Sequence, residues 1–531
     1  MMRKLLLILG ISAGLSACKP KPPLEAQVNA WYKHLVIYNL DVKTFQDSNG
    51  DGEGDFKGLI SRLDYLSALG VNTIWLAPFQ PSPLADDGYD ITDYTAIDAK
   101  LGTAADFRIF MRQAKARHLK VIMDIVLNHT SIQHPWFRQK PDWYLWSKER
   151  PSDWDKGMGF PVVEKDSWHL DSLSHQYFFH RFYHFEPDLN YQNPAVVREA
   201  ERVLAYWLDQ GMDGFRLDAV PFIIDDPRKD AAKPRFDFNI LHKLTGFVSK
   251  HNPQAVLLGE ANVDPQDNGK YFTGHHEGLQ MMFNFYANQY LFLALASGDA
   301  GQFKKALTQT QVKPGIAQWA WFLRNHDEID LGRLSKHELN QVYQKMGPDT
   351  NMQLYKRGLR RRLATMLGGD PKQINLAYSL LFSLPGTPVI REGEEIGMGE
   401  DLRLKERLAI RTPMQWDSTV NGGFTKGKPF RPLISSAEYG YQKVNVQTET
   451  KDSTSLLHKI RTLIKQRQAF PEIDNGAWQV LKTPDTVLAL LYSSNGKQAL
   501  IINNFSRKPQ ELNYKGRIYH LATYGTVWQH L

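Results

Sequence analysis

The sequence predicts an α/β protein built on a closed (β/α)8 barrel, and three observations support this fold class. Short apolar segments of strand character mostly alternate with segments of helical periodicity, which favours a parallel sheet. Eight such units can be recognised, the number that closes into a TIM barrel. No glycine-rich phosphate loop follows the first strand, which argues against an open doubly wound sheet.

The strand and helix patterns can be placed along the chain in order. The eight expected strands cover residues 35–40, 73–78, 121–126, 214–220, 256–261, 280–285, 319–323 and 387–391. The clearest helical patterns cover residues 56–69, 104–117, 196–209, 238–250 and 455–468. Gly70 is placed to end the first helix, and Asn193-Pro194 suits the start of the third.

Two segments do not follow the alternation of strands and helices that is expected of the barrel. Residues 130–187 are rich in Trp, Tyr, Pro and charge and are too long for a barrel loop, which predicts an inserted subdomain. The barrel would then consist of residues 31–129 and 188–470. In residues 471–531, short apolar runs bounded by turn residues predict a small C-terminal β-sandwich.

The N-terminus has the pattern of an export signal. Residues 1–17 join a basic start to an apolar stretch that is too short to span a membrane as a helix. Leu15-Ser16-Ala17-Cys18 resembles a bacterial lipobox, and residues 18–30 would form a Pro/Lys-rich tether. We therefore expect lipidation of Cys18, the only cysteine, and a place in the bacterial cell envelope on the periplasmic or cell-surface side. An ordinary secretory signal with a coincidental cysteine is the alternative.

The composition and charge of the chain give no indication of a nucleic-acid partner and say little else about function. The net charge of +7 is a small excess spread over 531 residues, without a run of five or six like charges. The charge therefore indicates no nucleic-acid partner, and membrane contact is expected only through the lipid anchor. Aromatic residues make up 12% of the chain, and their ring faces suit sugar stacking, although large rings also fill cores.

Residues 47–55 form a glycine-rich loop with an oxygen-bearing side chain at every second position. Carboxylates and carbonyls on a curling loop are how proteins wrap a hard cation such as Ca²⁺. The loop is not an EF-hand, because Gly58 stands where the twelfth-position glutamate belongs, and a solvated acidic turn is the alternative. The candidate ligands are Asp47, Asn49, Asp51, Glu53 and Asp55.

The apolar strand at residues 214–220 carries Arg216 and, two residues later, Asp218. Side chains alternate across a strand, so these two point to the same side. The arginine favours the ionised form of the aspartate, and a buried charged carboxylate is costly unless it is paired or used. Asp218 is therefore either a candidate nucleophile or one half of a structural ion pair.

Carboxylates also follow two other expected strands. Glu260 ends the fifth strand and Asp327 follows the seventh. Barrel enzymes hold their catalytic residues at the C-terminal ends of the strands, so these groups would face one mouth with Asp218. Three ionised carboxylates would repel one another, so one should have a raised pKa and keep its proton. Glycosidic bond cleavage requires one protonated and one ionised carboxyl group.

These motifs resemble glycoside hydrolase family 13, the α-amylase family. Four segments match its signature regions in order, and they are residues 124–129, Gly214 to Val220, Gly259-Glu260 and Asn325-His326-Asp327. Asp87-Gly88-Tyr89-Asp90 and Pro187-Asp188-Leu189-Asn190 add two flanking motifs. The resemblance runs from about residue 31 to the C-terminus.

The resemblance implies a role for each matching residue. Asp218 would be the nucleophile, Glu260 the general acid/base, and Asp327 would bind the sugar hydroxyls in the transition state. The reaction would retain configuration through a covalent glucosyl-enzyme. The residues implied to hold the sugar or the nucleophile are Tyr89, Asp90, His129, Arg216 and His326.

The resemblance also assigns structural calcium. It places Ca²⁺ on Asp47, Asn49, Asp51, Asp55 and the carbonyl of Glu53, and a second calcium ion on Asn128, Asp188 and Asp225. Two departures near the mouth affect the expected substrate preference. Arg391-Glu392-Gly393-Glu394-Glu395 stands where Tyr-Tyr-Gly-Asp-Glu is common, and Glu186 stands where glutamine is common.

Within the family, the chain is most similar to trehalose synthases and their α-glucosidase relatives, and Ala219 is typical of α-1,4-acting members. The first hypothesis is hydrolysis of α-1,4-glucosidic bonds in maltose or short malto-oligosaccharides. The alternative is a trehalose synthase that isomerises maltose by intramolecular transfer. The similarity to trehalose synthases favours transfer, whereas the predicted lipoprotein signal favours hydrolysis. A third hypothesis, a non-catalytic sugar-binding lipoprotein, conflicts with the intact carboxylates.

Overall fold

The computed structural model describes residues 30–231, 233–272 and 277–531. The expected signal peptide, Cys18 and all of the tether except residue 30 lie outside the described residues.

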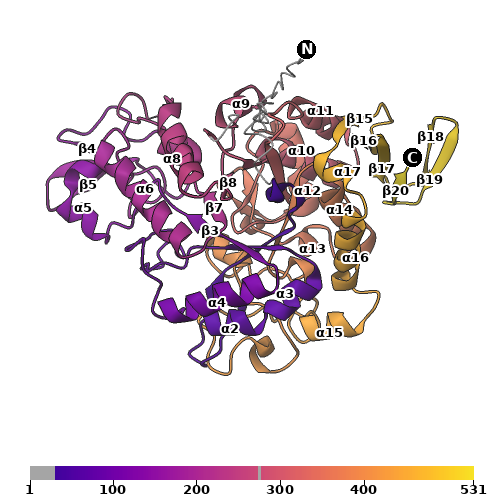
Figure 1. Cartoon of the computed structure of the whole chain (residues 1–531), viewed down its shortest axis with the longest axis horizontal. Coiled ribbons are helices and arrows are strands. Elements are labelled where there is room, and N and C mark those ends of the chain that lie inside the picture. Colours follow the sequence, from indigo (N-terminus) through magenta and orange to yellow (C-terminus); the bar gives the residue numbers. More distant parts are fainter. Residues whose placement is uncertain (1–29, 232, 273–276) are drawn as a thin grey trace, which may run out of the picture.

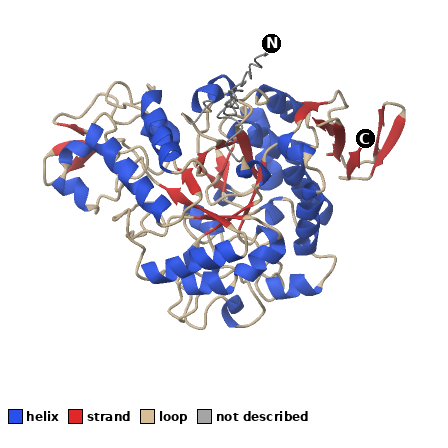
Figure 2. Cartoon of the chain, in the orientation of Figure 1, coloured by secondary structure: helices blue, strands red, loops and turns tan. Residues whose placement is uncertain are grey.

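Eight parallel strands close into a barrel at the centre of the molecule, surrounded by helices (Figures 1 and 2). This confirms the predicted fold class, and every expected strand is present. In barrel order the strands are β1 (Ile37–Leu40), β2 (Thr73–Leu76), β3 (Lys120–Ile125), β7 (Gly214–Leu217), β8 (Val256–Gly259), β9 (Met281–Phe283), β10 (Gln318–Phe322) and β14 (Thr387–Arg391). Apart from Lys120, all their residues are buried, as expected for parallel strands covered on both faces.

The helices follow the predicted pattern with one difference. The helical pattern over residues 56–69 is two helices, because the chain breaks at Arg62, whose φ is −110° and ψ is 5°. Gly70 ends the second helix with φ +99°, and the Asn193 side chain caps α6. The main helices are α2 (Phe56–Ser61), α3 (Leu63–Leu69), α4 (Ala104–Ala116), α6 (Pro194–Asp209), α8 (Phe238–His251), α10 (Phe285–Ser297), α11 (Gly301–Gln309), α12 (Lys336–Met346), α14 (Pro371–Ser383) and α16 (Leu456–Gln468).

The expected insertion between the third and fourth barrel strands is present, and we call it subdomain B (Figure 1, left). It contains α5 (Pro135–Gln139) and a three-stranded antiparallel sheet of β4 (Trp146–Ser147), β5 (Trp168–Asp171) and β6 (Gln176–Phe179). A second excursion, after β10, was not predicted from the sequence. Its strands β11 (Ile329–Asp330), β12 (Gln353–Leu354) and β13 (Gly358–Leu359) have two residues each, too few for a periodic pattern.

The C-terminal residues form two antiparallel sheets, as the sequence predicts. One sheet has the order β15-β16-β17-β20 and the other pairs β18 with β19. They share a small apolar core that includes Val487, Ile502, Tyr519 and Leu521. The strands are β15 (Ala477–Val480), β16 (Val487–Ser494), β17 (Lys497–Asn504), β18 (Gln510–Tyr514), β19 (Arg517–Leu521) and β20 (Thr526–His530).

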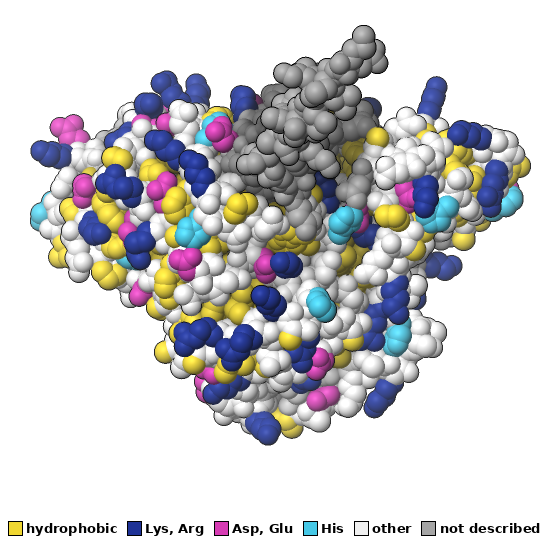
Figure 3. All heavy atoms as spheres, viewed as in Figure 1, with side chains coloured by type: hydrophobic (Ala, Val, Ile, Leu, Met, Phe, Trp, Pro, Cys, Tyr) yellow, Lys and Arg dark blue, Asp and Glu magenta, His cyan; other side chains and the backbone are white. Residues whose placement is uncertain are grey.

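Lys and Arg side chains are spread over the face shown in Figure 3, from subdomain B to the C-terminal strands, and acidic groups are interspersed among them. On this face they form no single large basic patch. Among the described helices, none combines the length and the apolar character that a membrane crossing would need.

Arg467 joins the barrel to the C-terminal sheets. Its buried guanidinium donates to the main-chain carbonyls of Phe382 (2.7 Å) and Gly386, beside β14. It also pairs with Asp474 at 2.5 Å, in the short helix α17 (Glu472–Asn475) that leads into β15. One side chain of α16 therefore satisfies acceptors from three separate segments.

We expect Arg467→Ala to lower the free energy of unfolding by about 1–3 kcal/mol, because it leaves the carbonyls of Phe382 and Gly386 without this donor, whereas Asp474 keeps its contact with His34. Urea denaturation measures this loss. Arg403→Ala is the control, since Arg403 pairs with Asp401 but is 75% exposed, and should cost about 1 kcal/mol or less. Equal losses in the two variants would contradict the structural role of Arg467.

Candidate active site

A cavity of about 460 Å³ opens at the C-terminal ends of the barrel strands. Asp218 directly follows β7, Glu260 directly follows β8, and Asp327 lies in the loop after β10. All three carboxyl groups line the cavity, so the structure brings together the three that the sequence places at strand ends. The volume lies within the range of small-molecule sites.

The guanidinium of Arg216 organises the carboxyl groups on one side of the cavity. Its Nη1 atom lies 2.5 Å from Asp218 Oδ1 and 2.8 Å from Asp124 Oδ1. Its Nη2 atom lies 2.8 Å from Glu260 Oε2, which also accepts the main-chain N–H of Ala219 at 3.0 Å. Because one guanidinium contacts both Asp218 and Glu260, these carboxyls lie close together, as a retaining mechanism requires.

Burial sets the protonation of this pair. Burial raises the pKa of Asp218 to about 6, although Arg216 favours the ionised form. Arg216 favours the ionised form, as the sequence predicts, but the loss of solvent outweighs it and leaves the pKa of Asp218 above the ordinary aspartate value. Burial, together with the charges of Asp218 and Asp327, raises the pKa of Glu260 to about 8. Near pH 7, Asp218 is mostly ionised and Glu260 mostly protonated.

Asp327 is surrounded by two arginines and a histidine. Arg407 Nη1 lies 2.8 Å and Arg411 Nη2 lies 3.2 Å from its Oδ1 atom, and His326 Nε2 lies 3.0 Å from Oδ2. Burial raises the pKa of Asp327, but His326 and the two arginines outweigh it and keep the pKa well below its usual range. Asp327 is therefore the permanently charged carboxylate of the three.

Tyr89 and His129 line the adjoining wall, and His326 packs against Tyr89 behind it. The Tyr89 hydroxyl donates to Asp124 Oδ2 at 3.0 Å and lies 2.5 Å from His326 Nε2, and its ring stacks on His326 with centroids 5.2 Å apart. His129 lines the cavity, and its Nε2 atom has no hydrogen-bond partner among the described residues. Burial lowers the pKa of each histidine to about 3, so both rings are neutral near pH 7.

The structure does not place Asp90 where the resemblance suggested. Asp90 is fully buried, and its oxygens accept from the Ser82 hydroxyl (2.7 Å) and the main-chain N–H groups of Ala85 and Asp86. It therefore holds its own loop together and does not line the cavity. Asp86 lines the cavity instead and pairs with Arg407 Nη2 at 2.6 Å.

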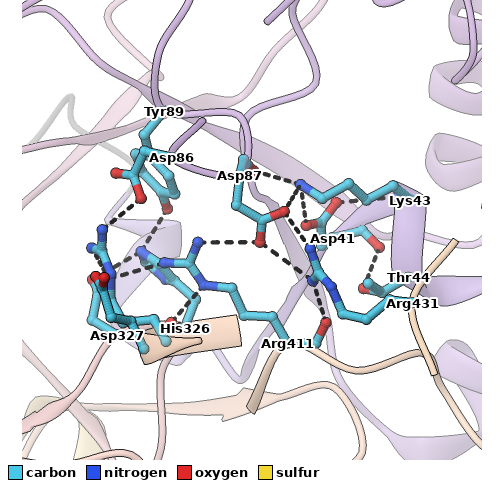
Figure 4. A network of polar contacts seen from close by, with 12 residues as sticks. Asp41, Lys43, Thr44, Asp86, Asp87, Tyr89, His326, Asp327, Arg411 and Arg431 are labelled. Atoms are coloured by element: carbon cyan, nitrogen blue, oxygen red, sulfur yellow. Dashed lines mark hydrogen bonds and ion pairs between the residues drawn. The ribbon is translucent and has the colours of Figure 1, made fainter. Parts of the chain in front are cut away.

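Asp87, the neighbouring carboxylate, anchors the loop that carries Tyr89 (Figure 4). It pairs with Lys43, Arg411 and Arg431, at 3.2, 3.2 and 2.8 Å. Although burial raises its pKa, these cations outweigh the effect and keep the pKa well below the usual range. Arg411 also contacts Asp327, so the loop and the site carboxylate share one guanidinium.

The two departures from the family pattern do not line the cavity. Arg391 and Glu392 are buried and pair with each other at 3.0 Å, while Glu392 also accepts from the Thr44 hydroxyl. They tie β14 to the segment after β1. Glu186 is fully buried, lies 3.7 Å from His129 and accepts the main-chain N–H of Tyr183 at 3.2 Å, so it can act on the site through these two residues.

Aromatic side chains from separate segments form a cluster at the rim of the cavity, which Phe160 lines, and we call this cluster with Glu406 the cover. The rings of Phe160, in subdomain B, and Tyr355, after β12, stack with centroids 4.6 Å apart. Tyr183 and Tyr355 both donate to Glu406 Oε2, at 2.5 and 3.1 Å. Arg357 closes the same side by donating to the carbonyl of Gly159 at 3.1 Å. Sequence reasoning missed these residues, because they follow no periodic pattern.

The side chains of the loop at residues 47–55 have the chemistry that a calcium site needs. The loop's ligands are all oxygen donors, and Asp47 already curls the loop by accepting the N–H groups of Asn49, Gly50 and Gly52. Hard oxygen donors on a curled loop suit Ca²⁺.

The second assignment does not fit. Arg181 Nη2 lies 2.7 Å from Asp225 Oδ2, and its main-chain N–H donates to Asp188 Oδ1 at 2.8 Å. This buried guanidinium supplies the positive charge that the second calcium ion was expected to bring. Arg181 therefore competes with a second calcium ion at Asp188 and Asp225, which argues against the site expected at Asn128, Asp188 and Asp225.

A parallel barrel with a close pair of carboxyls in opposite protonation states, and a third carboxylate opposite, defines an enzyme that acts on glycosidic bonds. The family model of the alpha amylase catalytic domain matches residues 40–355 and 335–476. The chain belongs to the α-amylase family, glycoside hydrolase family 13, and is an α-glucoside-acting enzyme.

The chain is similar to relatives of known name within this family. The chain is 38% identical over 517 residues to the trehalose synthase/amylase TreS of Mycobacterium tuberculosis H37Rv, covering 94% of this chain and 85% of that protein. It is 30% identical over 564 residues to the oligo-1,6-glucosidase of Parageobacillus thermoglucosidasius, covering 93% and 95%. The crystal structure of the α-glucosyl transfer enzyme XgtA matches with a TM-score of 0.77 at 28% identity, covering 94% and 99%.

We propose that the loop at residues 47–55 binds structural Ca²⁺, and we expect EGTA to lower the melting temperature. Calcium at a hundred times its Kd would stabilise the fold by about 2.7 kcal/mol. Thermal unfolding with and without Ca²⁺ measures this shift. Asp51→Ala should abolish the shift, whereas Asp349→Ala, an exposed acidic residue elsewhere, should keep it. The same melting temperature with and without EGTA in the unmodified protein would contradict the proposal.

Proposed function

We propose that this enzyme transfers glucose within its active-site cavity and isomerises maltose to trehalose. The observation that carries the proposal is the aromatic cover, which would hold a released glucose molecule and limit the access of water. The relatives support it, because the named trehalose synthase is 38% identical and the named glucosidase 30%. Hydrolysis of the same α-1,4 bond would share the first chemical step.

In the first step, the Asp218 carboxylate would attack the anomeric carbon, while Glu260 protonates the leaving oxygen. The bond from C1 to the leaving glucose breaks and a glucosyl-enzyme ester forms. Arg216 touches both groups, so it can stabilise the carboxylate forms of each as the proton moves. Asp327, held charged by Arg407 and Arg411, would accept hydrogen bonds from the sugar hydroxyls.

In the second step, the released glucose would turn and attack the ester through its anomeric hydroxyl, and Glu260 would take back the proton. No water is consumed, so the two sugars leave as an isomer of the substrate. Whether water or glucose captures the ester depends on how well the cavity excludes water. The contacts of Phe160, Tyr355 and Glu406 join subdomain B to the opposite wall and support capture by glucose.

The pKa values predict a bell-shaped dependence of kcat/KM on pH. Activity should rise as Asp218 loses its proton near pH 6 and fall as Glu260 loses its proton near pH 8. Steady-state rates across pH 4–10 measure both limbs.

Glu260→Gln tests whether the loss of activity near pH 8 is due to the titration of Glu260. With an aryl α-glucoside, whose leaving group needs no proton, the variant should keep the limb near pH 6 and lose the limb near pH 8. An unchanged alkaline limb in Glu260→Gln would assign that titration to another group. Asp218→Ala should have no measurable turnover at any pH, because it removes the nucleophile.

Product analysis after incubation with maltose tests the proposed function. We expect trehalose as the main product, with glucose as a minor one. Tyr355→Ala should open the cover and raise the ratio of glucose to trehalose by about tenfold, which corresponds to ~1.4 kcal/mol in the relative barriers.

Tyr206→Ala is the control for the loss of a tyrosine, because Tyr206 is half-buried on the barrel helix α6 and does not line the cavity. It should leave the product ratio unchanged. Glucose as the only product of the unmodified enzyme would overturn transfer in favour of hydrolysis.

A further inference from the structure

Subdomain B holds a cluster of ionisable side chains that the active site does not use. Asp166 precedes β5, His169 lies on β5, and His180 directly follows the neighbouring strand β6. His180 Nε2 lies 2.9 Å and His169 Nδ1 lies 3.4 Å from the same oxygen, Asp166 Oδ1. The three candidate ligand atoms all lie within 4.8 Å of one another.

The hydrogen bonds of His180 fix which of its nitrogens carries a proton. Its ring is buried, and its Nδ1 atom lies 3.1 Å from the main-chain oxygen of Phe182, which can only accept. Nδ1 is therefore the donor, and in the neutral ring Nε2 presents a lone pair to Asp166. Two acceptors 2.9 Å apart need a proton or a metal ion between them. A histidine oriented by a carbonyl at its other nitrogen is the usual arrangement in metal sites.

We propose that Asp166, His169 and His180 bind a divalent transition-metal ion of the Zn²⁺ type. In a tetrahedral zinc site with bonds of about 2.0–2.1 Å, neighbouring ligand atoms lie roughly 3.3–3.4 Å apart. The observed separations of 2.9 and 3.4 Å are close to that edge length. Two imidazole nitrogens and one carboxylate favour zinc over Ca²⁺, which prefers oxygen donors throughout.

Two further side chains border the cluster. The His184 ring lies beside the His169 ring, with centroids 5.3 Å apart, and its Nδ1 atom lies 3.2 Å from Glu164 Oε1. His169 and His184 are about half exposed, so the ion can be reached from solvent. The fourth ligand is water or His184.

The site connects to the active-site wall through the chain. The residues directly after His180 include Phe182, which lines the cavity, and Tyr183, which donates to Glu406 in the cover. A metal ion would fasten the segment at Asp166 to the start of this wall. Bound metal should therefore slow hydrogen exchange in residues 164–186.

Titration of the untagged full chain with Co²⁺ tests the proposal, because a tetrahedral nitrogen and oxygen site gives Co²⁺ visible absorption. We expect one Co²⁺ per chain, displaced by one Zn²⁺ and not by Ca²⁺. His169→Ala should weaken binding at least tenfold, and Asp166→Asn likewise. These residues are partly exposed, so both variants should fold, which circular dichroism checks.

His251→Ala is the matched control. His251 Nε2 lies 2.8 Å from Asp209 Oδ1, the same pair of groups without a third ligand, and its loss should leave Co²⁺ binding unchanged. If the unmodified chain gives no visible absorption with Co²⁺, or if His169→Ala and Asp166→Asn bind as tightly as it does, the cluster is a protonated histidine–aspartate network and the proposal is wrong.

Discussion

The active site depends on one buried guanidinium shared among carboxylates from three neighbouring strands. Arg216 lies on β7 and contacts Asp124 of β3, Asp218 at the end of its own strand, and Glu260 after β8. Three carboxylates so close together and so well buried would not remain charged without it. The arginine can serve all three because parallel strands bring their carboxyl ends to the same edge of the sheet.

Because Asp218 and Glu260 share the charge of Arg216 with Asp124, their pKa values differ from each other. A lone positive charge cannot fully compensate three buried carboxylates, so burial raises the pKa of Asp218 to about 6 and that of Glu260 to about 8. On the other side of the cavity, Asp327 has the opposite balance, since Arg407, Arg411 and His326 surround a single carboxylate. In the proposed reaction, the same chemical group thus serves as a nucleophile, an acid and a fixed charge through its neighbours alone.

The parts of the site that were predictable are those fixed by strand periodicity. Asp218 and Glu260 follow strands whose ends the apolar pattern locates, so their convergence could be expected. Asp86 and Asp90 lie in a loop that turns three times through positive φ, at Leu84 (+61°), Asp87 (+57°) and Gly88 (+112°), and no pattern shows which carboxylate faces inward. Arg181 was missed for a related reason, because only the folded insertion brings it between Asp188 and Asp225.

The outcome of the reaction depends on contacts that strand periodicity does not encode. In the proposed reaction, the barrel and its carboxylates form the glucosyl-enzyme. The fate of that ester depends on whether Phe160, Tyr355 and Glu406 keep subdomain B joined to the opposite wall while glucose turns. These residues come from segments far apart in sequence, so each can change without disturbing the barrel. A single scaffold can therefore change from hydrolysis to transfer through its cover, while the shared arginine and its carboxylates stay the same.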